Sequence, residues 1–184
     1  MSWLTLNVSC PNTKEGMIET AQELDTLLAE IQKLNSKHIP LLLKLSPDTH
    51  DELLVQVMDL AGRFEVCGFI CGNTTLSRPG STSYHPLAGE RGGLSGRPIK
   101  ELSLRLVRKV YGLKAIDQVI VGVGGIFTGG DAYDFIKAGA NVVQLYTGLI
   151  WQGPTCVRDI CADLSNRLQS DGLSLAQATG GELS

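Results

Sequence analysis

The chain has 184 residues and a formal net charge of −3, with 16 Lys and Arg against 19 Asp and Glu. That length suits one domain, and the absence of a Lys/Arg block argues against a nucleic-acid-binding surface. No apolar run is long enough for a transmembrane segment and no secretory signal follows the first methionine, so we expect a soluble, cytoplasmic protein.

Short apolar runs alternate with longer segments of helical periodicity along the whole chain. The apolar runs predict five strands, at residues 3–9, 40–46, 67–75, 117–125 and 141–148. The helical segments that follow them are residues 18–35, 48–64, 99–113, 128–140 and 155–170. Continuous apolar strands alternating with helices are typical of parallel sheets built from βα units.

Two parallel-sheet architectures compete for this pattern, a doubly wound sheet and a (β/α)₈ TIM barrel. No G-x-G-x-x-G motif follows the first strand, as a dinucleotide-binding sheet would require. The glycines instead follow the fourth and fifth strands, where the phosphate sites of barrels lie after the last strands. We therefore predict an α/β fold in which residues 1–184 form a single, incomplete domain, the last five of eight βα units.

A complete barrel has about 250 residues. We therefore expect a missing N-terminal barrel segment that supplies the first three units. Without that segment the first and last strands would be unpaired edges.

The second helical segment has a candidate cap at its start. Asp48 or Thr49 is the expected N-cap.

Polar residues and glycines stand where the strands end, which in a barrel is the functional mouth. Lys44 interrupts an apolar strand, either as a surface lysine or as a cation held against developing negative charge. Asn7, Asn12 and Asn73 offer carboxamides to a planar ligand, although each could be a turn residue. Gly124-Gly125 can cradle a phosphate monoester, or serve loop geometry alone.

Five cysteines occur in the chain, and an odd number argues against a disulfide framework. The pairs Cys67/Cys71 and Cys156/Cys161 lack nearby histidines, so core packing is favoured over zinc and no metal site is predicted. Cys10 lies where the first apolar run breaks. A thiol with a pKa of about 8.5 can act as a base after modest tuning, and the alternative is a turn cysteine.

The segment from residue 76 to residue 96 is too long for a simple connection. Loops beyond about 12–15 residues are commonly functional or disordered. His85 lies within this segment, where we favour a solvated side chain over a ligand contact. His38 and His50 are expected at the surface near helix ends.

Seven sequence blocks stand out when they are taken together. They are LNVSCPNT, LLLKLSPD, GNTTLSRP, GGLSGRPI, VIVGVGGIFTGGDA, IKAGANVVQLYTG and the Gly153-Pro154 pair. In this order, over nearly the whole chain, they resemble the dihydroorotate dehydrogenase family. The resemblance implies an FMN-dependent barrel that oxidises dihydroorotate to orotate in pyrimidine (UMP) biosynthesis, passing hydride to FMN and then electrons to quinone.

The resemblance also implies roles for individual residues. Cys10 matches the base that removes a proton from C5 of the substrate as hydride leaves C6 for flavin N5. Substrate contacts match Asn7, Asn12, Asn73 and Thr74. Contacts to FMN match Asn7, Lys44, Gly72, Ser95, Gly96, Val123, Gly124, Gly125, Leu145, Tyr146 and Thr147, with Lys44 at the N1/O2 edge of the flavin.

The electron acceptor is indicated by two sets of features that disagree. The blocks NTTLSRP, GGLSGRPI and LYTGLIWQGP resemble the membrane-associated, quinone-reducing class, which ordinarily carries serine in place of Cys10. The stretch CPNTKEG resembles the soluble class that uses cysteine and relays electrons to NAD. Gly72 also departs from the quinone type, in which many members carry threonine and gain a hydroxyl contact to the flavin. We favour quinone, with a peripheral inner-membrane contact through the absent N-terminal region.

Several alternatives remain open at this point. They are an NAD- or fumarate-linked dihydroorotate dehydrogenase, another FMN barrel, and a non-catalytic module that binds FMN or phosphate. The other barrels considered are dihydropyrimidine dehydrogenase and tRNA dihydrouridine synthase, of which the latter would need a basic face and an added helical domain. In the favoured interpretation the chain is inactive until the missing barrel units are supplied.

Overall fold

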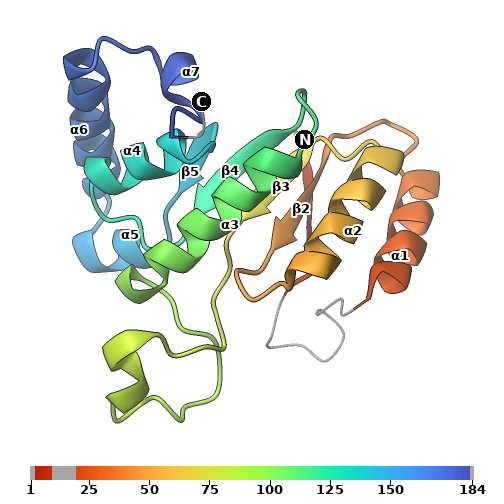
Figure 1. The fold of residues 1–184 in the computed structure, drawn as a ribbon, viewed down its shortest axis with the longest axis horizontal. Coiled ribbons are helices and arrows are strands. Elements are labelled where there is room, and N and C mark those ends of the chain that lie inside the picture. The colour runs from red at the N-terminus through yellow and green to blue at the C-terminus, as the bar shows by residue number, and fades with distance from the viewer. Residues whose placement is uncertain (1–2, 10–19, 183–184) are drawn as a thin grey trace.

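The computed structural model describes residues 3–9 and 20–182, and its sheet contains five parallel strands (Figure 1). They are β1 (Leu4–Asn7), β2 (Leu41–Leu45), β3 (Gly68–Cys71), β4 (Val119–Val123) and β5 (Val142–Gln144). Their order in the sheet is their order in the chain, and every neighbouring pair is parallel. All five predicted strands are confirmed, each shorter than predicted because its polar end leaves the ladder.

Each strand is followed by one of the predicted helices. These helices are α1 (Ala21–Leu34), α2 (Asp51–Arg63), α3 (Lys100–Leu113), α4 (Gly129–Lys137) and α6 (Cys156–Ser170). The sequence did not predict the short elements η1 (Gly80–Tyr84), η2 (Arg97–Ile99), α5 (Thr147–Gln152) and α7 (Leu175–Ala178). Elements of three to six residues are too short to show a hydrophobic period, which explains why they were missed.

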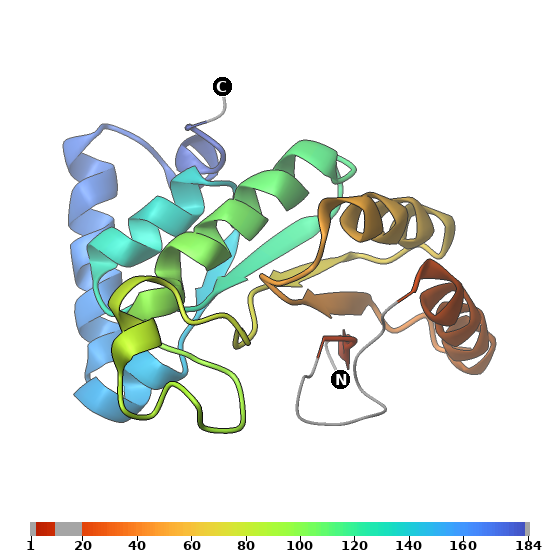
Figure 2. The ribbon, with the colours of Figure 1, turned by 60° about the horizontal axis from the view of Figure 1, so that its bottom comes forward.

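The two faces of the sheet have different environments. Side chains alternate along a strand, so Leu43, Phe69 and Ile120 face the helices and join one large buried cluster with them. Figures 1 and 2 show α1 to α4 on this same side of the sheet. A doubly wound sheet carries helices on both faces, whereas a barrel carries them on the outside only. The chain therefore has the layering of consecutive barrel units.

The opposite face of the sheet has no helix layer among the described residues. Leu42, Ile70 and Val121 form a separate small cluster there. Val119 and Val142, the first residues of β4 and β5, are 41% and 54% exposed. In a closed barrel these side chains would point into the interior. No described helix layer covers this face, so its apolar surface stays partly open.

The expected N-cap of the second helix is wrong. α2 begins after His50, which makes no side-chain capping hydrogen bond. The carboxylate of Asp48 instead accepts hydrogen bonds from the Thr75 hydroxyl and the Leu76 backbone N–H. Asp48 therefore joins the end of β2 to the loop after β3. A carboxylate used in this way is not available to cap the helix.

The expectation of core packing for the cysteine pairs is only half correct. Cys71 and Cys156 are buried, but Cys67 and Cys161 are exposed. Burial raises the pKa of the Cys71 thiol, which keeps it protonated and unreactive. Within the described residues no group of three or more His, Cys, Asp or Glu side chains could hold a metal ion. Nor is any described helix both long and apolar enough to cross a bilayer.

Candidate functional site

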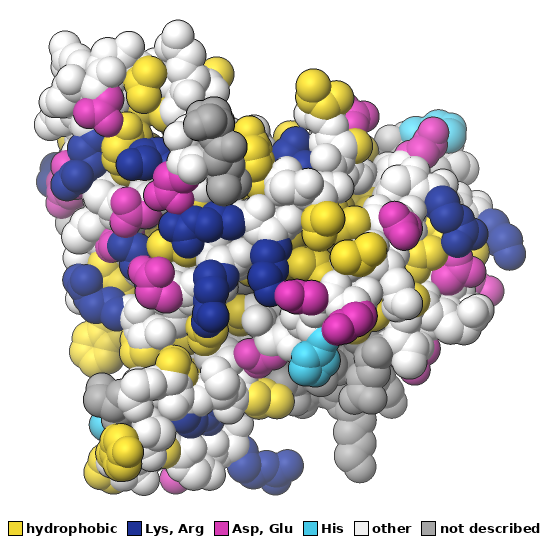
Figure 3. Space-filling view, viewed as in Figure 1, with side chains coloured by type: hydrophobic (Ala, Val, Ile, Leu, Met, Phe, Trp, Pro, Cys, Tyr) yellow, Lys and Arg dark blue, Asp and Glu magenta, His cyan; other side chains and the backbone are white. Residues whose placement is uncertain are grey.

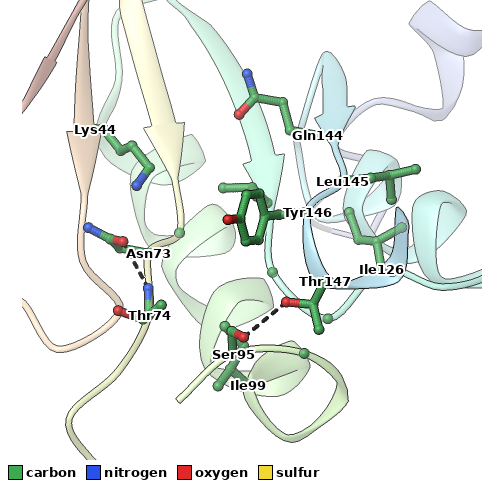
Figure 4. Close-up of a pocket in the computed structure, with 16 residues that line it drawn as sticks. Lys44, Asn73, Thr74, Ser95, Ile99, Ile126, Gln144, Leu145, Tyr146 and Thr147 are labelled. Carbon is green, nitrogen blue, oxygen red and sulfur yellow. Dashed lines mark hydrogen bonds between the residues drawn. The ribbon is translucent and has the colours of Figure 1, made fainter. Parts of the chain in front are cut away.

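A cavity of about 580 Å³ lies at the carboxyl ends of the strands (Figure 4). Parallel strands bring their carboxyl ends to one edge of a sheet, which is where open α/β sheets bind ligands. The cavity is lined by Lys44, Gly72, Asn73, Thr74, Ser95, Gly96, Ile99, Val123, Gly124, Gly125, Ile126, Gln144, Leu145, Tyr146, Thr147 and Gly148. Five segments far apart in sequence thus meet around one space.

Nearly all of the residues singled out in the sequence meet at this cavity. Every predicted cofactor residue except Asn7 lines it, and so do the predicted substrate residues Asn73 and Thr74. Asn7 lies beside them, since its side-chain oxygen accepts from the Asn73 amide at 3.4 Å. Cys10 and Asn12 lie outside the described residues. The roles of all these residues stay predictions, while the proximity of those that the structure describes is a structural fact.

Four lining residues were missed, namely Ile99, Ile126, Gln144 and Gly148. Gln144 carried a usable signal, because it interrupts an apolar strand as Lys44 does. It pairs in register with Val123 at the end of β4. Ile99 and Ile126 carried none, since an isoleucine beside a cavity looks like any core isoleucine in the sequence.

Lys44 lies on the face of the sheet that faces away from the helices. It follows Leu42 by two residues, which puts both side chains on the same side of β2, and it pairs in register with Ile70. Its side chain is half-buried and lines the cavity, so the surface-lysine alternative does not describe its position (Figure 4). Tyr146 and Thr147 stand across the cavity from it.

Asn73 fastens the end of β1 to the end of β3. Its amide group donates to the carbonyl oxygen of Ser9 at 2.8 Å and to the Ser9 hydroxyl at 3.0 Å. The Ser9 hydroxyl in turn donates to the carbonyl oxygen of Lys44 at 3.0 Å. Ser9, which the sequence did not single out, is therefore the buried centre of this network. The network fixes the chain directly before Cys10 to two residues that line the cavity.

The long loop after β3 is folded around one arginine. Two backbone hydrogen bonds between Thr75 and Leu94 close the base of the loop, at 2.8 and 3.1 Å. Inside it, the Arg78 guanidinium donates to the carbonyl oxygens of Thr75, Leu76, Ser77, Ala88, Glu90 and Gly92. This arrangement fixes the spacing of Thr74 and Ser95, the cavity residues at the two ends of the loop.

The histidines have the positions expected of them. His85 is exposed in this loop, where its ring Nδ1 accepts from the Leu87 backbone N–H at 3.2 Å. His38 and His50 are exposed close to the ends of α1 and α2. None of the three lines the cavity.

An Arg78→Lys variant should open the loop although the charge is kept. An ammonium group is a point donor and cannot reproduce a planar fork that reaches carbonyls on several sides. We expect trypsin to cut after the exposed Arg91 about tenfold faster, because losing one charged hydrogen bond of about 1.5 kcal/mol shifts an opening equilibrium by that factor. The control is Arg105→Lys, at an exposed position on α3. Equal cleavage rates in both variants would contradict the role assigned to Arg78.

Backbone geometry, more than side chains, shapes the far side of the cavity. Gly124 and Gly125 have φ angles of +120° and +78°, in the region that favours glycine. A Cβ on Gly124 would lie 2.3 Å from the Ser103 hydroxyl, and one on Gly125 would lie 2.8 Å from the Lys100 Cα. The backbone of these two glycines therefore packs against the first turns of α3, with no space for a side chain. No hydrogen bond among the described residues engages their backbone N–H groups.

A pair of charged residues secures the segment that follows these glycines. The Lys100 ammonium donates to Asp131 at 2.6 Å and to Asp134 at 2.8 Å. The other oxygen of Asp131 accepts from the backbone N–H groups of Phe127 and Thr128, both at 2.9 Å. Burial opposes the charged form of each partner. The hydrogen bonds and charges nevertheless outweigh it, lowering the pKa of Asp131 and raising that of Lys100.

The lowered pKa of Asp131 makes a definite prediction about acid. A carboxylate whose pKa is lower in the folded state contributes stability that is present above its unfolded pKa of about 4 and is lost as the pH falls through the folded value. The urea midpoint should therefore drop between about pH 5 and about pH 3, and less steeply in Asp131→Asn. Asp117→Asn, which removes an exposed carboxylate, is the control and should keep the full pH dependence. A slope unchanged by Asp131→Asn would contradict the prediction.

Comparisons with known proteins agree with this geometry. The family model described as dihydroorotate dehydrogenase matches residues 1–168. The chain belongs to the dihydroorotate dehydrogenase family. It is 44% identical over its whole length to the dihydroorotate dehydrogenase (quinone) of Halobacterium salinarum, and 39% identical over 96% of its length to that of a Cyanothece species.

Solved structures support the same fold. A DHODH of Eimeria tenella in complex with ferulenol superposes with a TM-score of 0.89 at 32% identity, and its ligand-free form with 0.90 at 31%. The chain matches over 98% and 100% of its own length, but over 54% and 56% of those chains. It likewise spans 52% of the Halobacterium relative and 49% of the Cyanothece one. The predictions of the family and of a partial barrel are both confirmed.

Proposed function

We propose that the chain is the carboxyl-terminal, FMN-binding part of a dihydroorotate dehydrogenase. In this proposal residues 1–184 form one incomplete domain that oxidises dihydroorotate to orotate only when the remaining barrel units are supplied. The observation that carries it is the cavity itself, which has a half-buried lysine on one side and paired glycines on the other (Figure 4). The names of the relatives at 39% to 44% identity favour quinone as the final electron acceptor.

The residues present fit a flavin mononucleotide in both shape and charge. Among the described residues nothing hydrogen-bonds the backbone N–H groups of Gly124 and Gly125, and side chains at these positions would collide with α3, as expected of a cradle for phosphate oxygens. The hydroxyls of Thr147 and Ser95, hydrogen-bonded to each other at 2.9 Å, belong to residues that line the same cavity. The apolar side chains of Val123 and Leu145 would flank the ring system.

A bound flavin would supply the two-electron acceptor, and the chain's own residues would prepare the transfer. The Lys44 ammonium would lie at the edge of the ring where reduction deposits negative charge, which lowers the energy of that charge in a partly water-excluded site. Asn7, Asn73 and Thr74 would orient the substrate ring by hydrogen bonds. Cys10, outside the described residues, would take the C5 proton of the substrate. A peripheral membrane contact would belong to the absent region.

The experiment that tests this proposal compares two flavins and one substrate. The chain should bind FMN more tightly than riboflavin, which lacks the phosphate, as measured by quenching of flavin fluorescence. When the missing barrel units are supplied, dihydroorotate should bleach the bound flavin. Equal affinity for FMN and riboflavin would refute the phosphate cradle. A flavin that binds but stays oxidised after substrate is added would leave a non-catalytic flavin-binding module as the function.

A further inference from the structure

The first turn of α3 touches the segment after β4 at both of its ends. At the near end, a Cβ on Gly125 would lie 2.8 to 2.9 Å from the backbone N, Cα and Cβ of Lys100, so the glycine rests directly on that residue. At the far end, the Lys100 ammonium reaches Asp131 and Asp134 on α4. One residue therefore spans the segment from its glycines to the start of the next helix.

Asp131 passes this restraint on to the backbone of the segment. One carboxylate oxygen binds Lys100, while the other accepts from Phe127 and Thr128 N–H groups, and the Thr128 hydroxyl accepts from the Asp131 N–H at 3.1 Å. The side chains of Lys100 and Asp131 are largely shielded, with 23% and 11% of their surface exposed. An ion pair so shielded and hydrogen-bonded on several sides holds a defined geometry, unlike a mobile surface pair.

Charge gives Lys100 a second effect on the same segment. Asp131 and Asp134 are two carboxylates close behind a backbone cradle suited to an anion. Lys100 contacts both of them, so removing it would leave two carboxylates without their shared cation at the end of the segment that would hold the phosphate. Lys100 thus supports the shape of the cradle, and it also offsets negative charge that would repel an anion bound there.

We propose that Lys100 is a positioning residue for the phosphate of the flavin, acting through Asp131 on the Gly124-to-Thr128 segment. This inference rests on the proposed function, because it requires a phosphate at the paired glycines. Lys100 does not line the cavity, so it would act on the phosphate through the segment and not by direct contact. Its effect is therefore confined to the phosphate end, and the ring end of the cavity is formed by other segments.

The test uses the contrast between FMN and riboflavin in three variants of the 184-residue chain. Lys100→Met removes the ion pair, Lys100→Arg keeps a cation that can reach both carboxylates, and Lys109→Met is the matched control. Lys109 is on the same helix and is paired with Asp51 of α2, so its loss changes the charge equally without touching the segment. Fluorescence titration gives the ratio of riboflavin to FMN dissociation constants for each protein.

We expect Lys100→Met to lower that ratio about tenfold, the scale of one lost hydrogen bond to a charged group. Riboflavin affinity should stay within about twofold of the parent, and Lys100→Arg and Lys109→Met should keep the parental ratio. Amide hydrogen exchange at Phe127 and Thr128 should accelerate in Lys100→Met alone. A merely structural loss would weaken both flavins equally and leave the ratio unchanged.

The outcomes separate this inference from the proposed function. A parent chain that binds FMN no better than riboflavin overturns the phosphate cradle and the inference together. A parent chain that prefers FMN, with a Lys100→Met variant that prefers it equally, overturns the inference alone. A fall in the ratio for Lys109→Met as large as that for Lys100→Met also overturns it, because net charge would then explain the result.

Discussion

Replacing Cys10 by alanine should leave FMN bound while slowing its reduction by dihydroorotate at least about 100-fold, the usual worth of a general base. The proton at C5 would have no acceptor, whereas the contacts to the flavin would be unchanged. The described chain supports this placement up to Ser9, which is hydrogen-bonded to Asn73 and to the backbone of Lys44 at the cavity. Stopped-flow bleaching of the flavin, in the protein supplied with the remaining barrel units, measures the rate.

Cys67→Ala provides the matched control for this experiment. Cys67 is an exposed thiol directly before β3, at the amino ends of the strands and therefore at the opposite edge of the sheet from the cavity. Its loss should leave the rate of flavin reduction unchanged. A Cys10→Ala enzyme that reduces its flavin at the normal rate would remove this thiol from the mechanism.

Replacing Gly72 by alanine should destabilise the chain by about 3 kcal/mol, the combined scale of a strained backbone and an overpacked contact. Gly72 has a φ of +137°, and an added Cβ would lie 1.9 Å from the carbonyl oxygen of Val123. That oxygen belongs to the backbone at the end of β4 and cannot move aside without opening the cavity. The midpoint of a urea unfolding curve measures the loss.

The control for Gly72 is the same substitution at Gly62. This glycine is exposed in α2, and nothing lies within 4 Å of its added Cβ. Gly62→Ala should therefore stabilise the chain by about 0.5–1 kcal/mol through helix propensity alone. A Gly72→Ala chain as stable as the parent would contradict the close contact between β3 and β4.

The geometry at Gly72 also limits which side chains can contact a flavin in the cavity. Many quinone-type members are expected to carry threonine at this position, with a hydroxyl directed at the flavin. The backbone of this chain has no room for any Cβ there. A flavin in this cavity must therefore be held without that hydroxyl, and Lys44 and Asn73 are the neighbouring polar side chains that line the cavity.

The sequence predicted the order of strands and helices well, because period and polarity are local properties. Lys44 was recognisable for the same reason, since a charge inside an apolar strand is visible without coordinates. Contacts made across the sheet were not predictable in this way. Asp48 looked like a helix cap, yet it binds Thr75 on the next loop, 27 residues away. Ser9 carried no signal in the sequence, and only the pairing of β1 with β2 and of β2 with β3 brings it to Lys44 and Asn73.

The exposed fractions of Val119 and Val142 have a consequence for solution behaviour. Among the described strands, β1 and β5 are the margins of the sheet, each bonded to one neighbour only. A sheet with open margins and a bare apolar side can recruit further strands from any source, which is the usual start of aggregation. Lys44 lies on that side and also lines the cavity, so a segment that covers the side would lie next to the cavity as well. Solubility, completion of the fold and flavin capture are then linked equilibria, and each one shifts the other two.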